Sequence, residues 1–149
     1  MQYHFKIYKE GSGFWAHGVE LEGCVTQADS REELEFNMAE ALNGMLDEPE
    51  GSQHIFPYPD LTITGRNIVK VSVDPQIAFA MQVRQSRVTN KWTQKEAAKA
   101  LGMKNIYSYQ RLESSKTANP ELSTLTRLCK VFPGFSVDRI LDTGAFAQV

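Results

Sequence analysis

The chain has 149 residues, of which 42% are hydrophobic and 23% are charged. These fractions are ordinary for a folded globular protein and exclude a chain that is disordered throughout. No apolar run approaches the roughly 18 residues of a membrane span, and the N-terminus alternates polar and apolar residues instead of forming a signal peptide, so we expect a cytoplasmic protein without a membrane partner.

The net charge of −2 conceals an uneven distribution along the chain. Residues 1–74 contain five Lys and Arg against thirteen Asp and Glu, whereas residues 75–149 contain eleven against five. A basic half joined to an acidic half predicts one module for a polyanion and one for a different partner, such as a basic protein. The alternative is that both halves simply carry solvated charges.

The cysteines and histidines give no sign of a metal site. Cys24 and Cys129 lie far apart and neither belongs to a CxxC pair, so we expect two buried thiols. The three histidines stand at scattered positions that match no ligand spacing. We therefore predict no metal and no cofactor.

The first 74 residues have the pattern of a small α+β domain. Residues 3–8 alternate apolar and polar side chains, and the glycines at 11 and 13 precede an aromatic stretch at 14–19, which together predict a β-hairpin. Ser30 followed by Glu33 is a capping box that begins an amphipathic helix. The expected elements are strands at 3–8, 14–19 and 24–26, a helix from the Ser30 cap to about Leu46, a loop at 47–60, and strand candidates at 61–64 and 68–73. The order is βββα and then β.

A family resemblance rests on the sequence GCVTQ at 23–27, followed by Asp29, Ser30 and a helix with glutamates in its first turn. This stretch resembles the N-terminal domain of HicB antitoxins. The resemblance implies a partial RNase H-like fold and a partner that is similar to the small, basic, mRNA-cleaving HicA toxin. Four aromatic residues are candidate toxin-binding anchors, namely Phe14, Trp15, Phe56 and Tyr58.

An RNase H-like fold raises the alternative of a metal-dependent nuclease. Two-metal nucleases hold Mg²⁺ with several carboxylates that converge from strand ends. Glu20, Glu22 and Asp29 stand near strand ends here, but nothing in their spacing makes them converge. We therefore expect no catalytic residues and no enzyme.

Residues 91–113 predict a helix-turn-helix. Thr93 and Glu96 form a capping box at the start of one helix, and Gly102 can take the left-handed conformation that ends it. Ile106, Tyr109 and Leu112 then give a second helix one apolar side. Two short helices joined by a glycine turn, the second with a polar outer face, fit the DNA major groove.

Three further helices complete the second half of the chain. Pro75 is suited to a first turn, the leucines at 122, 125 and 128 predict a fourth helix, and residues 135–141 predict a fifth with Ser136 as its cap. The pattern resembles the five-helix helix-turn-helix of phage-repressor-like proteins. The resemblance implies that Gln94 touches a phosphate and braces the recognition helix. The spacing from Leu101 to Leu112 is one residue longer than usual, which leaves the start of the recognition helix open.

The candidate DNA-binding residues carry the donors and acceptors that base edges and phosphates require. The candidates for base edges or phosphates are Lys104, Asn105, Tyr107, Ser108 and Arg111, and those for phosphates are Gln94, Lys95 and Lys116. The competing interpretation is that these are ordinary exposed helix residues and that Tyr107 is partly buried.

Together these patterns predict an α+β toxin-binding domain at 1–74 and an all-α, five-helix DNA-binding domain at 75–149. The expected function is an antitoxin that neutralises a HicA-like toxin and represses its own operon by binding double-stranded operator DNA as a homodimer or higher homo-oligomer. The main alternative is a transcriptional repressor whose N-terminal domain senses a small ligand and has no toxin partner.

Overall fold

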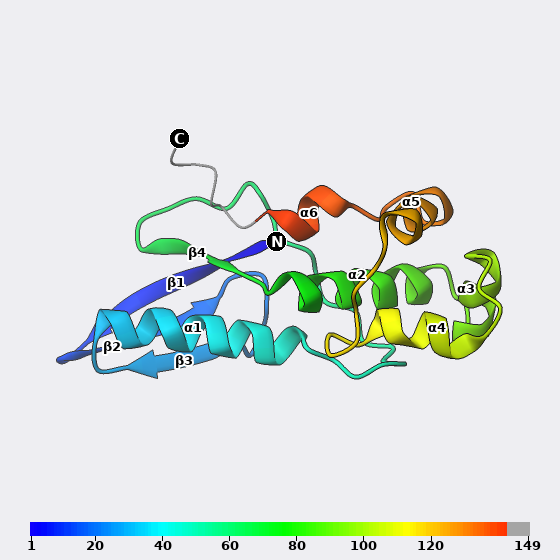
Figure 1. The fold of residues 1–149 in the computed structure, drawn as a ribbon. Helices are drawn as coiled ribbons and strands as arrows, with labels where there is room; N and C mark the ends of the chain where they lie inside the picture. The colour runs from blue at the N-terminus through cyan, green and yellow to red at the C-terminus, as the bar shows by residue number, and fades with distance from the viewer. Residues whose placement is uncertain (143–149) are drawn as a thin grey trace. The chain divides into compact units, whose positions relative to one another are not determined.

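Residues 1–142 are described by a computed structural model, in which the chain divides into two compact units (Figure 1). Unit 1 comprises Met1–Leu46, Phe56–Asp74 and Asp142. Unit 2 comprises Asp47–Ile55 and Pro75–Leu141. Of the loop predicted at 47–60, residues 47–55 therefore group with the second half of the chain, and the rest groups with the first.

Unit 1 is built on a four-stranded antiparallel sheet with the order β3-β2-β1-β4. The strands are β1 (Gln2–Glu10), β2 (Gly13–Gly18), β3 (Val25–Ala28) and β4 (Ile68–Ser72). The predicted hairpin is confirmed, because β1 and β2 pair with Tyr8 opposite Trp15 and turn through Gly11, whose φ is 60°. Strands β3 and β4 then extend this hairpin on its two sides.

One face of the sheet is covered by helix α1 (Arg31–Leu46), which contacts β2, β3 and β4 and runs alongside β3 in Figure 1. The buried residues of α1 recur every four positions, as a helix with one apolar face requires. They are Leu34, Met38, Leu42 and Leu46. Tyr3, Phe5 and Ile7, which alternate along β1, are buried as well. Because neighbouring strand residues point to opposite faces, Tyr8 and Trp15 lie on the other face, where their rings stack with centroids 4.2 Å apart.

Unit 2 is helical. Its elements are α2 (Pro75–Thr89), α3 (Gln94–Ala100), α4 (Ile106–Gln110), the 3-10 helix η1 (Arg111–Glu113), α5 (Leu122–Val131) and α6 (Val137–Leu141). Helix α2 is buried along most of its length, and the Phe79 and Phe135 rings meet edge to face, 5.9 Å apart. The Gln82 side chain joins α2 to the start of α6, because its amide donates to the Ser136 carbonyl at 2.9 Å and accepts from the Ser136 N–H at 3.1 Å.

The fold class predicted from the sequence is wrong. The structure has a four-stranded antiparallel sheet with helices following, and six α-helices in residues 1–142. A small sheet with six helices does not fit a βββαβ domain followed by an all-α domain of five helices. The segment predicted as one recognition helix is also divided, because its α-helical part ends at Gln110 and the chain then tightens into the 3-10 helix η1, in which Glu113 is buried.

Two smaller predictions are also wrong. Residues 61–64 form turns and irregular structure instead of a strand, and Leu61 is 81% exposed. Cys129 is exposed, whereas Cys24 is buried as expected, and burial raises the pKa of the Cys24 thiol. Cys129 lies on α5 beside the buried Leu128, so a one-residue step along the helix separates a core position from a solvent position.

Candidate functional site

The helix-turn-helix of unit 2 is formed by α3 and α4. The capping box predicted at α3 is confirmed, because the Thr93 hydroxyl accepts the Glu96 N–H at 3.1 Å and the Glu96 carboxylate accepts the Thr93 N–H at 3.3 Å. Gly102 follows the end of α3 and has the left-handed backbone conformation, with a φ of 71°. Small side chains at Ala97 and Ala98 are buried on the inner face of α3, which lets α4 pack closely.

The start of the recognition helix, which the sequence left open, is at Ile106. Asn105 is its N-cap, and its side-chain oxygen accepts the Ser108 N–H at 2.9 Å. The Ser108 hydroxyl lies 3.3 Å from the same oxygen. The extra residue of the turn is thus accommodated before the helix. Bidentate pairing of Asn105 with adenine needs the same oxygen, so this residue caps the helix in the free protein and is a weaker candidate for reading a base.

The outer side of the helix-turn-helix carries the predicted DNA-binding residues. Seven of them are exposed, namely Lys95, Lys104, Asn105, Tyr107, Ser108, Arg111 and Lys116. Tyr107 is 73% exposed, so the interpretation that it is partly buried is wrong. Tyr109, on the opposite side of α4, has no exposed surface. Its burial is the main cause that raises the pKa of its hydroxyl, and the negative charge of the nearby Glu113 carboxylate is the second. The surface therefore offers ammonium, guanidinium and hydroxyl donors around a short helix, as phosphates and base edges require.

A buried ion pair fixes the end of the recognition helix to α2. Arg87 donates to the Glu113 carboxylate through Nε at 2.6 Å and through Nη2 at 3.1 Å, and both side chains are 2% exposed or less. Burial disfavours the charged guanidinium, but the hydrogen bond and the charge of Glu113 outweigh it and raise the pKa of Arg87. Arg84 donates to the Glu113 carbonyl at 2.7 Å. Two buried arginines therefore hold one residue at the end of η1.

Gln94 connects this ion pair to the surface. Its side-chain nitrogen donates to Glu113 at 3.3 Å and to Glu50 at 2.6 Å, and its side-chain oxygen accepts from Gln110 at 3.1 Å. The contact with Gln110 braces the recognition helix. Of the eight predicted DNA-binding residues, Gln94 is the one that is half-buried.

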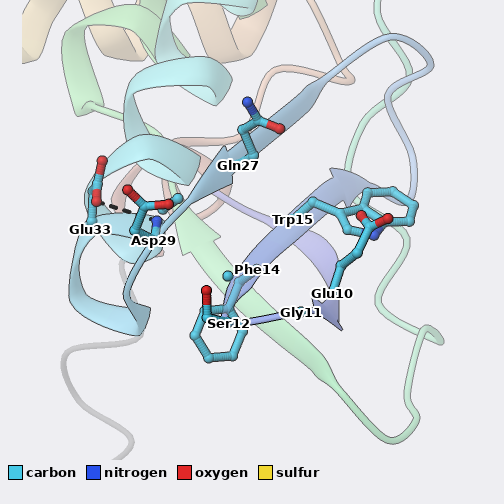
Figure 2. A pocket seen from close by; sticks show the side chains of 10 residues that line it. Glu10, Gly11, Ser12, Phe14, Trp15, Gln27, Asp29 and Glu33 are labelled. Atoms are coloured by element: carbon cyan, nitrogen blue, oxygen red, sulfur yellow. Dashed lines mark hydrogen bonds between the residues drawn. The ribbon is translucent and has the colours of Figure 1, made fainter.

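Unit 1 has an acidic hollow of about 530 Å³ at the hairpin end of the sheet (Figure 2). Its lining includes the carboxylates of Glu10, Asp29 and Glu33 and the rings of Phe14 and Trp15. Phe14 and Trp15 are consecutive residues of β2, so their rings point to opposite faces of the sheet, as Figure 2 shows. The hollow therefore reaches around the strand and combines negative charge with aromatic surface, which suits a cationic side chain.

The four predicted toxin anchors do not form one cluster. Phe14 and Trp15 line the acidic hollow, whereas Phe56 and Tyr58 do not. Phe56 is only 9% exposed, so it packs inside the protein instead of offering a surface anchor. Tyr58 is half-buried. Of the two loop aromatics, Phe56 thus belongs to the interior of unit 1.

No protein-family model matches the chain, and no curated protein matches it.

The carboxylates considered for a nuclease are not gathered into a metal site. Glu20 accepts the His4 N–H at 2.9 Å and faces His4 Nδ1 at 2.8 Å. Within residues 1–142, no group of three or more His, Cys, Asp or Glu side chains is arranged to hold a metal ion. The same part of the chain has no helix with the length and apolar character needed to cross a membrane.

Sequence reasoning missed three residues of this site, namely Arg87, Glu113 and Glu50. Nothing near Arg87 in the sequence indicates that it is buried. Charged side chains are almost never fully buried unless they are paired, and the pairing residue, Glu113, lies 26 residues away. Glu113 ends the stretch 91–113 that predicts a helix-turn-helix, but no local pattern marks it as buried. Glu50 belongs to a proline-rich loop without periodicity, so no local signal shows that it meets Gln94.

Proposed function

We propose that the protein is an antitoxin, resembling HicB, that binds a small basic ribonuclease toxin and represses its own operon. The observation that carries the DNA-binding part is the capped helix-turn-helix whose outer side presents Lys104, Tyr107, Ser108 and Arg111. The buried ion pair of Glu113 with Arg87 fixes the last turn of the recognition helix. Less conformational entropy is then lost when the helix binds DNA.

A dimer of this chain would bind a palindromic operator, because one short recognition helix reaches only a few base pairs and paired half-sites multiply the contacts. The test is fluorescence anisotropy with the DNA upstream of the protein's own reading frame. Arg111→Ala should weaken binding by about 1–3 kcal/mol if Arg111 reads a base, with altered sequence preference. Arg31→Ala, which removes an exposed arginine of α1, is the control. Equal binding by both variants would remove Arg111 from the site.

The toxin-binding part of the proposal rests on unit 1. The acidic hollow offers three carboxylates and two aromatic rings to a basic partner, and complementary charge speeds such an encounter. We expect the partner to be encoded by the neighbouring reading frame as a small basic protein. Co-expression with that neighbour should relieve its toxicity and yield a complex that can be purified.

Charge reversal at the hollow tests which surface is used. Glu10→Lys should weaken the complex by about tenfold or more, since like charges then face each other. Glu40→Lys, at an exposed position of α1 that does not line the hollow, gives the same change in net charge and should have a smaller effect. If Glu40→Lys is the more damaging variant, the partner binds the outer side of α1. If neither the full chain nor a fragment of residues 1–74 forms a complex with the neighbouring protein, the antitoxin proposal fails.

The alternative is a repressor that senses a small ligand. Small-molecule pockets are predominantly apolar, whereas carboxylates make up much of the lining of the acidic hollow. The absence of a small basic protein in the neighbouring reading frame would favour this alternative.

A further inference from the structure

The segment 47–52 has the sequence DEPEGS, and we call it the acidic segment. Four hydrogen bonds join it to the helical part of unit 2, two of them to Gln94 and Glu113 of the helix-turn-helix region. The Ser115 hydroxyl donates to Asp47 at 2.6 Å, and Gln94 donates to Glu50 at 2.6 Å. The Gly51 N–H donates to Glu113 at 3.2 Å, and Arg87 donates to the Ser52 carbonyl at 3.3 Å. All of these residues belong to unit 2. The most acidic stretch of the loop is thus fixed to the basic module.

Both N–H donors of the Gln94 side chain are already hydrogen-bonded, one of them to the acidic segment. A glutamine amide has two N–H groups, and those of Gln94 face Glu50 and Glu113. A DNA phosphate can accept from Gln94 only after one of these carboxylates leaves. Glu113 is buried and paired with Arg87, so it stays. Glu50 is exposed and is therefore the group that can be displaced.

Charge adds to this competition. Asp47, Glu48 and Glu50 bring three negative charges to the helix-turn-helix, where Lys95 follows Gln94 and Lys116 follows Ser115. A phosphate that approaches these lysines meets carboxylates of the same sign, which disfavours the contact at distances within the Debye length of about 8–10 Å.

We propose that the acidic segment is an autoinhibitory element, in which Glu50 takes the place of a DNA phosphate at Gln94 and must be displaced when DNA binds. The inference rests on the proposed DNA-binding function of unit 2. The affinity of the free protein for DNA is then lowered by the fraction of molecules in which the acidic segment is docked. The acidic segment directly follows Leu46 of unit 1, and the chain re-enters unit 1 at Phe56, after residues 53–55. A partner bound to unit 1 can therefore bias the release of the segment through the chain.

The test measures binding of the full chain to its upstream DNA by fluorescence anisotropy. Glu50→Ala should tighten binding by about three- to tenfold, the size expected when one partly exposed, charge-assisted hydrogen bond no longer competes. Glu50→Gln keeps a neutral acceptor and should give a smaller gain. Both gains should shrink as salt is raised, because screening weakens the charge competition. Glu40→Ala removes an equal charge from the outer side of α1 and should leave the affinity unchanged.

A second pair of variants ties the effect to Gln94. In a Gln94→Ala background, Glu50→Ala should give a smaller gain than in the wild-type background, since the hydrogen bond is already lost and only the charge competition remains. Binding that depends on Arg111 but is equally tight in wild type, Glu50→Ala and Glu50→Gln would overturn the autoinhibition and leave the DNA-binding proposal standing. Failure of wild type and Glu50→Ala alike to bind any upstream DNA would overturn both. Binding by Glu50→Ala alone would support both.

Discussion

Glu113→Gln tests the buried ion pair that fixes the recognition helix. The substitution keeps the shape of the side chain but removes the negative charge that faces Arg87 at 2.6 and 3.1 Å. Glu113 has no exposed surface, and Arg84 and Arg87 are 2% and 1% exposed, so water does not replace the lost charge. Removing one partner of such a pair costs about 3–5 kcal/mol, because an uncompensated charge stays buried. We expect unit 2 to lose that much of its free energy of unfolding.

The measurement is urea unfolding followed by tryptophan fluorescence. The chain has two tryptophans, Trp15 in unit 1 and Trp92 in unit 2, where the Trp92 ring lies 5.5 Å from the Phe132 ring. In a Trp15→Phe background the signal therefore reports on unit 2. With an m-value of about 1–3 kcal/mol/M, the unfolding midpoint should fall by at least about 1 M.

Two comparisons separate the ion pair from a general effect of substitution. Glu121→Gln removes an exposed carboxylate at the start of α5 and should change stability by no more than about 0.5 kcal/mol. Replacing both partners, as in Arg87→Met with Glu113→Leu, should cost less than Glu113→Leu alone, since no unpaired charge remains at Arg87. A loss below about 1 kcal/mol for Glu113→Gln would refute the argument that the arginines depend on this carboxylate.

Three further predictions concern local features. Tyr109→Phe should make the free energy of unfolding less sensitive to alkali. The raised pKa of Tyr109 keeps its hydroxyl protonated in the folded protein while the unfolded chain ionises, so the wild type loses stability as pH rises above about 10. In thermal unfolding at about pH 9 to 11, the melting temperature of the variant should therefore fall less steeply with pH. Thr93→Ala should destabilise unit 2 by about 0.5–2 kcal/mol through loss of the cap, while Thr93→Ser retains most of it, as urea unfolding would show; equal losses would argue against the cap. Leu42→Ala should cost unit 1 about 2–5 kcal/mol, measured from Trp15 fluorescence, and a loss below about 1 kcal/mol would mean that α1 is not anchored at this position.

Local chemistry in the sequence was sufficient for several elements. The Thr93 capping box, the left-handed Gly102, the hairpin and the apolar face of α1 each depend on residues within a few positions of one another, and the structure confirms them. Periodicity placed Tyr109 on the apolar side of the second helix, and the structure shows Tyr109 buried and Tyr107 exposed.

Only the tertiary structure decided the features that join distant parts of the chain. Arg87 and Glu113 are 26 residues apart, and Glu50 and Gln94 are 44 residues apart, so no periodic pattern links either pair. The chain tightens after α4 into the 3-10 helix η1, where Glu113 is buried, and no local pattern in the sequence indicates that burial. The sequence determined that two short helices, α3 and α4, follow one another across a turn at Gly102. The fold decided which polar groups are committed inside the protein and which remain exposed, because hydrogen bonds and burial are set by neighbours in space.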